Sequence, residues 1–147
     1  MNILKIVITA DHAGYRLKEG ILKYLIAEKH EVNDLGTYTE ESIDYPEFGH
    51  AIAKIVLEKQ ADFGISICGS GNGINMTVNK YNGIRSALCW TEEIAKLARA
   101  HNDANICALP GRFINTETGI IIVKTFLETP FDGGRHERRI NKIPILI

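Results

Sequence analysis

Short runs of β-branched residues alternate with longer amphipathic segments along almost the whole chain, and this alternation constrains the fold more than any other feature. The runs with the length and composition of strands are 3–9, 31–35, 63–68, 84–88 and 106–109. Between them, apolar residues recur about every 3.6 positions, which predicts helices around 17–25, 48–56, 94–98 and 120–127. Because strands that alternate with helices build βαβ units, we expect a mostly parallel sheet with helices on both faces.

The chain has the length of one ordinary domain, 147 residues, and shows no repeat, linker or low-complexity tract. We therefore expect residues 1–147 to form a single doubly wound α/β domain, Rossmann-like or flavodoxin-like, with about five parallel strands. In such sheets ligands bind beyond the carboxyl ends of the strands, where the strand order reverses. The segments that we expect at those ends are Asp11–His12, Gly36–Thr37, Cys68–Ser70 and His101–Asn102.

Charge and cysteine content exclude several classes of protein. A formal net charge of -1 provides no field that would attract nucleic acid or an anionic membrane surface. No apolar run approaches the roughly 20 residues of a membrane-spanning helix. The 3 cysteines are scattered, which argues against a disulfide framework and a zinc site. We therefore expect a cytoplasmic protein with no metal-ligand set and no nucleic-acid or membrane partner.

A glycine-rich stretch, Cys68–Gly73, follows one expected strand and precedes a helix expected over 74–80. Backbone N–H groups in such a loop can converge on an anion, and the helix N-terminus adds positive potential. A dinucleotide fingerprint is excluded because its third glycine position is Ile74, and a Walker loop is excluded because no Gly-Lys-Ser/Thr follows. A helix N-terminus favours the thiolate form of a cysteine, so Cys68 is a candidate base for proton abstraction.

The alternative for Cys68 is a small buried hydrophobe, which is the common fate of a free cysteine. Asp11–His12 is a plausible acid/base pair, and its alternative is a helix cap with an exposed histidine. His101, next to Asn102, is a candidate general acid, and its alternative is a histidine favoured by the dipole at a helix C-terminus.

Basic residues cluster near the end of the chain. Arg135 and Arg139 are four positions apart, so both would project from one helical face and suit a phosphate dianion. Arg112 follows a Pro-Gly pair. A solvated helical face is the alternative explanation for this charge.

In their order and spacing these segments resemble the type B ribose-5-phosphate isomerase family, which also contains the subunits of galactose-6-phosphate isomerase. The resemblance covers essentially the whole chain. The matching segments are Ala10–Gly14, Asp44–Pro46, Cys68–Gly73, Asn79–Lys80, Gly83–Arg85, His101–Asp103 and Gly133–His136. One branch of the family lacks the cysteine and has glutamate at the position of Ile74, so the chain is identified as a member of the cysteine branch.

The resemblance implies an aldose–ketose isomerase of the pentose phosphate pathway that converts a small sugar phosphate through an enediolate. It implies Cys68 as the base that moves a proton between C1 and C2, and His101 as the ring-opening acid, assisted by Asp11. The residues that it implies as substrate ligands are His12, Tyr45, Gly69, Ser70, Gly71, Asn72, Gly73, Asn102, Arg112, Arg135 and Arg139. It implies no metal and no cofactor.

The resemblance also implies a homodimer, or a tetramer made of two such dimers, whose active site takes His101 and Asn102 from the second subunit. Two alternatives remain open for function. One is an isomerase of a six-carbon sugar phosphate, such as allose or galactose 6-phosphate. The other is a non-catalytic flavodoxin-like module that binds phosphate or a nucleotide. Galactose-phosphate enzymes need two different subunits, whereas this chain carries all the expected groups, which favours ribose.

Overall fold

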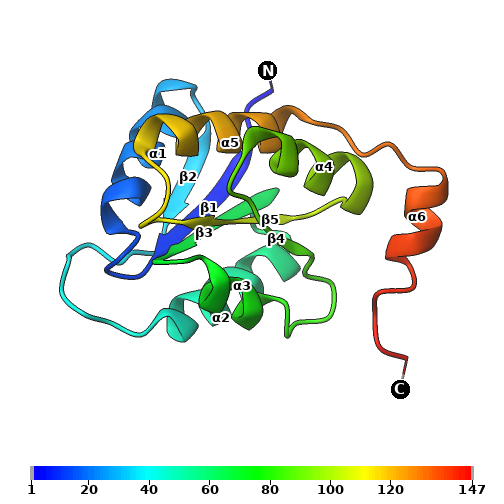
Figure 1. The fold of residues 1–147 in the computed structure, drawn as a ribbon, viewed down its shortest axis with the longest axis horizontal. Helices are drawn as coiled ribbons and strands as arrows, with labels where there is room; N and C mark the ends of the chain where they lie inside the picture. The colour runs from blue at the N-terminus through cyan, green and yellow to red at the C-terminus, as the bar shows by residue number, and fades with distance from the viewer. Residues whose placement is uncertain (1, 147) are drawn as a thin grey trace.

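The computed structural model describes residues 2–146 and contains one five-stranded sheet with the strand order β2-β1-β3-β5-β4 (Figure 1). All four strand pairs are parallel. The strands are β1 (Lys5–Ala10), β2 (Glu31–Asp34), β3 (Phe63–Cys68), β4 (Ser86–Leu88) and β5 (Ile106–Pro110). Each coincides with an expected strand, with bounds shifted by at most two residues.

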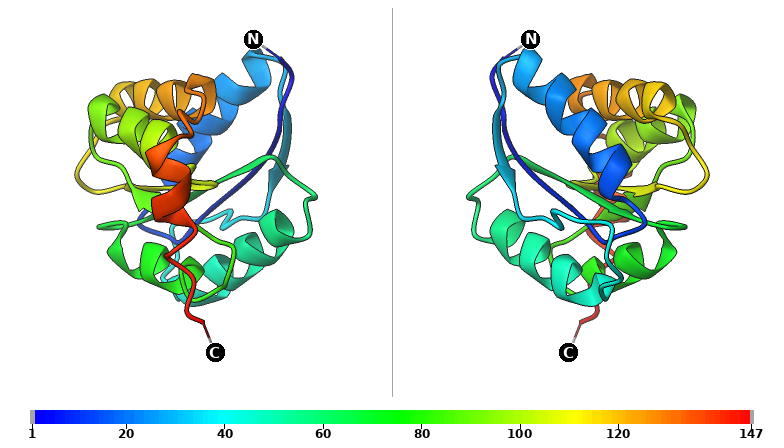
Figure 2. Two further views of the ribbon diagram at one scale, coloured as in Figure 1. Left: turned by 90° about the vertical axis from the view of Figure 1, so that its right-hand side faces the viewer. Right: turned by 90° about the vertical axis from the view of Figure 1, so that its left-hand side faces the viewer.

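Helices cover both faces of the sheet (Figure 2). They are α1 (Tyr15–Ala27), α2 (Tyr45–Leu57), α3 (Asn72–Val78), α4 (Glu92–Asn102), α5 (Thr116–Glu128) and α6 (Arg135–Ile140). α1, α4 and α5 lie on one face, whereas α2 and α3 lie on the other. The prediction of a doubly wound α/β fold is therefore confirmed. None of the helices within residues 2–146 has the length and apolar content needed to cross a membrane.

The core consists of two apolar layers, one on each side of the sheet. Along β1, Ile6 and Ile8 pack with the layer formed by α1, α4 and α5, and Val7 packs with the layer under α2 and α3. Side chains alternate between the two faces of a strand, so a sheet that is covered on both faces needs apolar residues at successive positions. The short β-branched runs of the sequence meet this requirement.

The strand order places a switch point between β1 and β3. From β1 the chain crosses by α1 to β2 on one side, and from β3 it continues toward β4 and β5 on the other. The loops that follow β1 and β3 therefore lie side by side, and the N–H of Asp11 donates to the carbonyl oxygen of Ile67 at 3.1 Å. This crevice is the expected ligand position in an open parallel sheet.

Helix starts differ in detail from the sequence expectation. Asp44 is the N-cap residue of α2, with Pro46 in the first turn, and the Asp44 side chain accepts no capping hydrogen bond. Thr91 and Asn115, by contrast, do cap α4 and α5 with their side chains. α3 begins at Asn72, two residues before its expected start, so the glycine-rich loop and the helix overlap.

Candidate active site

Cys68 is the last residue of β3 and begins the glycine-rich loop. It pairs in register with Pro110 of β5 and is 4% exposed. The N–H of Gly111 donates to the Cys68 carbonyl oxygen at 2.8 Å, and the N–H of Arg112 donates to the Gly69 carbonyl oxygen at 3.0 Å. The loop that follows β5 therefore fixes the backbone on which the thiol sits.

Two glycines of this loop are required by its geometry. Gly71 has φ +77°, and a Cβ atom there would lie 2.4 Å from Cδ1 of Leu88. At Gly73 a Cβ atom would lie 2.4 Å from Cζ of Tyr45. Tyr45, the first residue of α2, therefore lies directly over the first turn of α3.

The loop offers several free backbone donors. The N–H of Asn72 donates to Oγ of Ser70 at 3.2 Å. The N–H groups of Ser70, Gly71, Gly73 and Ile74, by contrast, donate to no acceptor within residues 2–146. Unpaired N–H groups at the start of a helix can bind an anion or a developing oxyanion.

Asp11 and His12 lie beside this loop, at the end of β1. Asp11 is 5% exposed, and its Oδ1 accepts from the N–H groups of Ala13 at 3.0 Å and Gly14 at 3.2 Å. The helix-cap interpretation of Asp11 is thus partly right, because this carboxylate closes the turn before α1. Nδ1 of His12 lies 3.1 Å from the backbone nitrogen and 3.2 Å from the carbonyl oxygen of Ile43, so the Ile43 backbone can bind this nitrogen in either tautomer of the ring.

Arg112 completes this group of residues. A Cβ atom at Gly69 would lie 3.3 Å from Nη1 of Arg112, so the guanidinium lies over the start of the glycine-rich loop. The structure therefore gathers ten of the expected site residues at the carboxyl edge of the sheet. We call them the cysteine group: Asp11, His12, Tyr45, Cys68, Gly69, Ser70, Gly71, Asn72, Gly73 and Arg112.

The remaining expected site residues form a second set, which we call the histidine group: His101, Asn102, Arg135 and Arg139. His101 and Asn102 end α4, and both arginines belong to α6. The rings of His101 and His136 stack with centroids 4.2 Å apart and planes 9° apart. α6 thereby packs against the end of α4 (Figure 1).

The electrostatics of the histidine group favour an anion. Burial lowers the pKa of His136, and the electrostatic interactions with His101, Arg135 and Arg139 lower it further, against an opposite effect of Asp132. The ligand atoms of His101, Asp132 and His136 lie within 4.8 Å of one another, which is a spacing that metal ligands can have. However, two guanidinium groups beside them repel a cation and attract a phosphate.

The two groups lie at opposite edges of the sheet. His101 precedes β5 and Cys68 pairs with the last residue of β5, so about four residues of strand, or roughly 13 Å, separate the two edges. The expectation that His101 and Asn102 lie at a carboxyl end of the sheet is therefore wrong. They follow a helix and come before a strand, and this order puts them at the amino edge. One chain does not bring Cys68 and His101 together.

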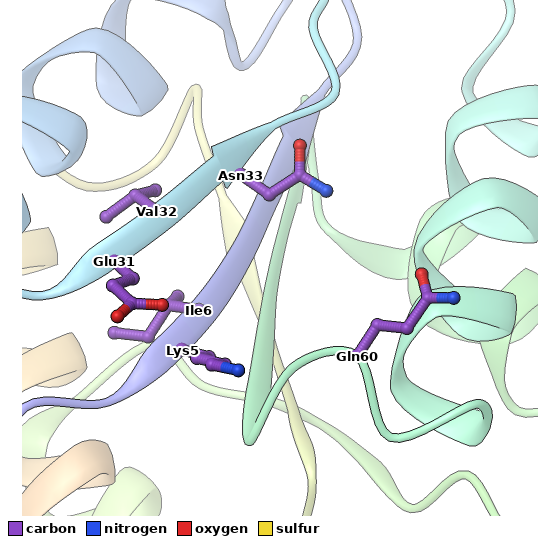
Figure 3. A pocket seen from close by; sticks show the side chains of 6 residues that line it. All are labelled: Lys5, Ile6, Glu31, Val32, Asn33 and Gln60. Atoms are coloured by element: carbon purple, nitrogen blue, oxygen red, sulfur yellow. The ribbon is translucent and has the colours of Figure 1, made fainter.

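Two hollows on the surface lie away from Cys68. One, of about 330 Å³, is lined by Lys5, Ile6, Glu31, Val32, Asn33 and Gln60 at the edge of the sheet (Figure 3). The other, of about 470 Å³, lies between residues 79–85 and 140–145. Neither contains Cys68, His101 or any other histidine or cysteine, so neither matches the chemistry that the sequence predicts.

Comparison with known proteins identifies the family. A profile described as Ribose/Galactose Isomerase matches residues 6–143. The chain belongs to this family. The resemblance to type B ribose-5-phosphate isomerases is thereby confirmed, and the protein is an isomerase of sugar phosphates.

Solved and curated members of the isomerase family match over nearly their whole length. A ribose 5-phosphate isomerase from Thermotoga maritima is 53% identical, with a TM-score of 0.95, over 97% of this chain and 98% of that one. Ribose-5-phosphate isomerase B from Mycoplasma genitalium, solved with bound ribulose-5-phosphate, is 42% identical with a TM-score of 0.89, over 95% and 93%. Ribose-5-phosphate isomerase B from Escherichia coli is 39% identical over 95% of this chain and 93% of that protein.

Sequence reasoning assigned no role to three residues that the structure places against the histidine group. The His136 ring stacks on the His101 ring, and the Asp132 carboxylate lies within 4.8 Å of the ligand atoms of both histidines. Arg85 binds the end of α4 from the other side. His136 and Arg85 lie inside segments that match the family, but their partners are 17 or more residues away in the sequence, so no local pattern reveals these contacts.

Proposed function

We propose that the protein interconverts ribose 5-phosphate and ribulose 5-phosphate through a cis-enediolate, with Cys68 as the base. The observation that carries this proposal is the position of the thiol. Cys68 ends β3 at the switch point of the sheet, next to backbone N–H groups that have no acceptor within residues 2–146. A base beside free donors is what enolisation requires, because negative charge develops on oxygen while a carbon loses its proton.

The chemistry follows in two stages. His101 protonates the ring oxygen of the furanose while Asp11 takes the proton from the anomeric hydroxyl, and the ring opens to the aldehyde. The Cys68 thiolate then removes the proton from C2, and the C2–H electron pair forms the C1=C2 bond of the enediolate. The charged oxygen is bound by N–H groups of the loop from Gly69 to Gly73. The thiol returns its proton to C1 while the O2 proton passes to O1, which yields the ketose.

Phosphate binding supports a site shared between two copies of the chain. His12 and Arg112 belong to the cysteine group, whereas Arg135 and Arg139 lie with His101 at the other edge of the sheet. A sugar phosphate that contacts both groups requires a second chain, which brings its histidine group to the first chain's Cys68. We therefore propose a homodimer, or a tetramer built from such dimers, in which Tyr45 and Asn102 bind the sugar hydroxyls.

Mixed dimers test this arrangement directly. Cys68→Ala and His101→Asn subunits are each expected to lose nearly all activity as homodimers, with a small residual rate left in His101→Asn. After the two are unfolded together and refolded, half of the dimers are hybrid, and each hybrid has one site with both groups intact. The mixture should therefore regain about a quarter of the wild-type activity. Absence of any recovery, with both proteins folded and dimeric, would contradict the shared site.

Two measurements separate the alternatives in function. Transfer of solvent deuterium into C2 of recovered ribose 5-phosphate distinguishes an isomerase that uses a proton-exchanging base from a module that only binds. A comparison of kcat/KM for ribose 5-phosphate, allose 6-phosphate and galactose 6-phosphate identifies the sugar, and we expect the five-carbon substrate to be preferred. The three free cysteines, all buried, are consistent with the reducing cytoplasm as the place of this reaction.

A further inference from the structure

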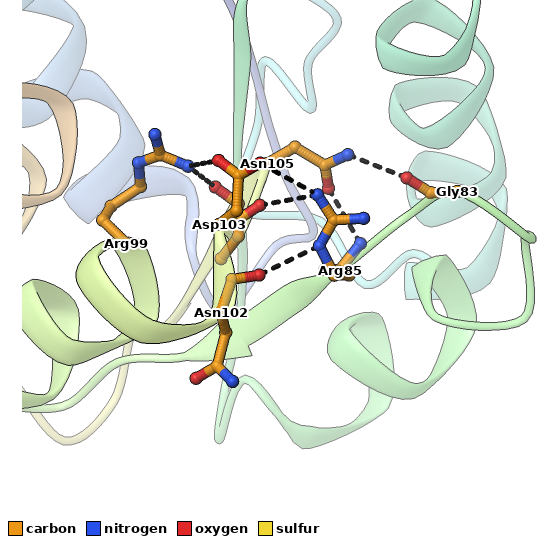
Figure 4. Close-up of polar contacts among 7 residues, drawn as sticks. Gly83, Arg85, Arg99, Asn102, Asp103 and Asn105 are labelled. Carbon is orange, nitrogen blue, oxygen red and sulfur yellow. Dashed lines mark hydrogen bonds and ion pairs between the residues drawn. The ribbon is translucent and has the colours of Figure 1, made fainter. Parts of the chain in front are cut away.

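The end of α4, which carries His101 and Asn102, is held by an arginine that comes from a different part of the sheet. Arg85 lies directly before β4. Its Nε donates to the carbonyl oxygen of Asn102 at 2.9 Å, and its Nη2 donates to the carbonyl oxygen of Asp103 at 2.9 Å (Figure 4). The last carbonyl groups of a helix have no partner within the helix, so one planar guanidinium satisfies two of them.

The backbone at this point has an unusual conformation. Asp103, the C-cap residue of α4, is left-handed with φ 46° and ψ 44°. That conformation costs a residue other than glycine roughly 1 kcal/mol or more, so its surroundings must stabilise it. The Asp103 carboxylate accepts from Nη1 of Arg99 at 2.8 Å and pairs with Nη2 of Arg85 at 3.4 Å.

The backbone of Arg85 is also fixed. Its N–H donates to Oδ1 of Asn105 at 2.9 Å, and its carbonyl oxygen accepts from the N–H of Asn105 at 2.9 Å. The amide of Asn105 in turn donates to the carbonyl oxygen of Gly83 at 2.9 Å. Hydrogen bonds of both the N–H and the carbonyl group of Arg85 thus join the start of β4 to the turn after α4. They fix the backbone from which the Arg85 side chain extends (Figure 4).

We propose that Arg85 is a positioning residue for His101 and Asn102, a role that deepens the proposed isomerase function and rests on it. Arg85 is not one of the expected substrate ligands. By binding the Asn102 and Asp103 carbonyl groups it determines where the last turn of α4 ends, and therefore where the His101 imidazole and the Asn102 amide point. A shift of about 1 Å in an acid of this kind can reduce turnover about 100-fold.

The test uses two substitutions. Arg85→Met removes the charge and all the donors of the side chain, whereas Arg85→Lys keeps the charge but loses the fork that reaches two carbonyl groups at once. We expect kcat to fall about 10- to 100-fold in Arg85→Met, with little recovery in Arg85→Lys. Lys96→Gln, a change at an exposed cation of the same helix, is the matched control and should leave activity unchanged. If Arg85→Met does not fold, Arg85→Lys carries the test.

Two further readouts distinguish positioning from a general structural role. In a His101→Asn background, Arg85→Met should reduce the residual activity by a clearly smaller factor than in the wild type, because one of the two groups through which it acts is already absent. In mixed dimers, an Arg85→Met subunit should recover activity with Cys68→Ala but not with His101→Asn, since Arg85 serves the histidine group of its own chain. An undiminished effect in the His101→Asn background, or recovery with His101→Asn subunits, would overturn the proposal.

The control pair keeps the two proposals distinguishable. If Cys68→Ala and His101→Asn subunits do not complement each other, the shared site is wrong. The role of Arg85 is then decided by the effect of Arg85→Met in the wild type compared with its effect in the His101→Asn background. If that pair complements and Arg85→Met has wild-type kcat, the shared site stands and the positioning role of Arg85 is wrong.

Discussion

Gly73→Ala, which adds one methyl group, should reduce the activity of this protein while leaving its stability nearly unchanged. The structure has no room for a Cβ atom there, because it would lie 2.4 Å from Cζ, 2.5 Å from Cε1 and 2.9 Å from Cε2 of Tyr45. Ordinary carbon contacts begin near 3.5 Å, so the tyrosine ring must retreat by about 1 Å or swing away. Tyr45 is 38% exposed, and it can move without displacing the core.

The effects on stability nearly cancel. Replacing glycine by alanine inside a helix contributes up to about 1 kcal/mol of stability, and Gly73 lies in the first turn of α3, where the gain is smaller. Moving the half-exposed Tyr45 ring away costs part of its packing, which is of similar size. We therefore expect the unfolding free energy to change by less than about 1 kcal/mol, and Tm by less than roughly 4 °C.

Activity should respond very differently. Tyr45 is a proposed ligand of the sugar, and the N–H of Gly73 is one of the free donors of the loop. Displacement of such groups by about 1 Å predicts a loss in kcat/KM of up to about 100-fold in Gly73→Ala. Met76→Ala, a change at an exposed position of the same helix, should retain both activity and stability.

Steady-state kinetics and thermal unfolding of the same preparations measure the effects of Gly73→Ala on activity and on stability. In a Tyr45→Ala background, Gly73→Ala should cause little further loss if ring displacement is the cause. Wild-type kcat/KM in Gly73→Ala, or a fall in Tm of more than roughly 10 °C, would refute the reasoning, because the methyl group would then have been absorbed by the loop or by the core.

Three further predictions follow from other buried groups. Lys18→Met should reduce the unfolding free energy in urea by about 3 kcal/mol, because it leaves the Asp34 carboxylate without the buried ammonium that lies 2.7 Å away; a change below about 1 kcal/mol would contradict this estimate. Burial lowers the pKa of His136, so stability should be complete above about pH 6.5 and decline as the pH falls below it; His136→Asn should flatten that part of a Tm-against-pH profile. A hydrogen bond with the Cys89 thiol, and burial, raise the pKa of Cys107, so Cys107 should react slowly with iodoacetamide. In the native protein Cys68 should be labelled first, and ribose 5-phosphate should slow that labelling. Peptide mass spectrometry would identify the labelled cysteine.

Local patterns were enough to predict the elements of this fold. The five runs predicted as strands form strands, and the segments with spacing near 3.6 form helices, because both patterns depend on side chains a few positions apart. The loop from Cys68 to Gly73 is equally local, since glycines and a following helix start are visible in six consecutive residues. Asp44 is the N-cap residue of α2 but its side chain makes no capping hydrogen bond, because capping depends on a rotamer that the sequence does not determine.

Only the tertiary structure decided which residues share an edge of the sheet. The sequence placed Cys68 after an expected strand and His101 between an expected helix and an expected strand, but it did not determine which strands are neighbours. The order of the strands, and with it the set of residues that gathers around Cys68, depends on the packing of segments dozens of residues apart. The same packing brings Arg85 to the end of α4, because hydrogen bonds to backbone carbonyl groups leave no pattern in the residues that accept them.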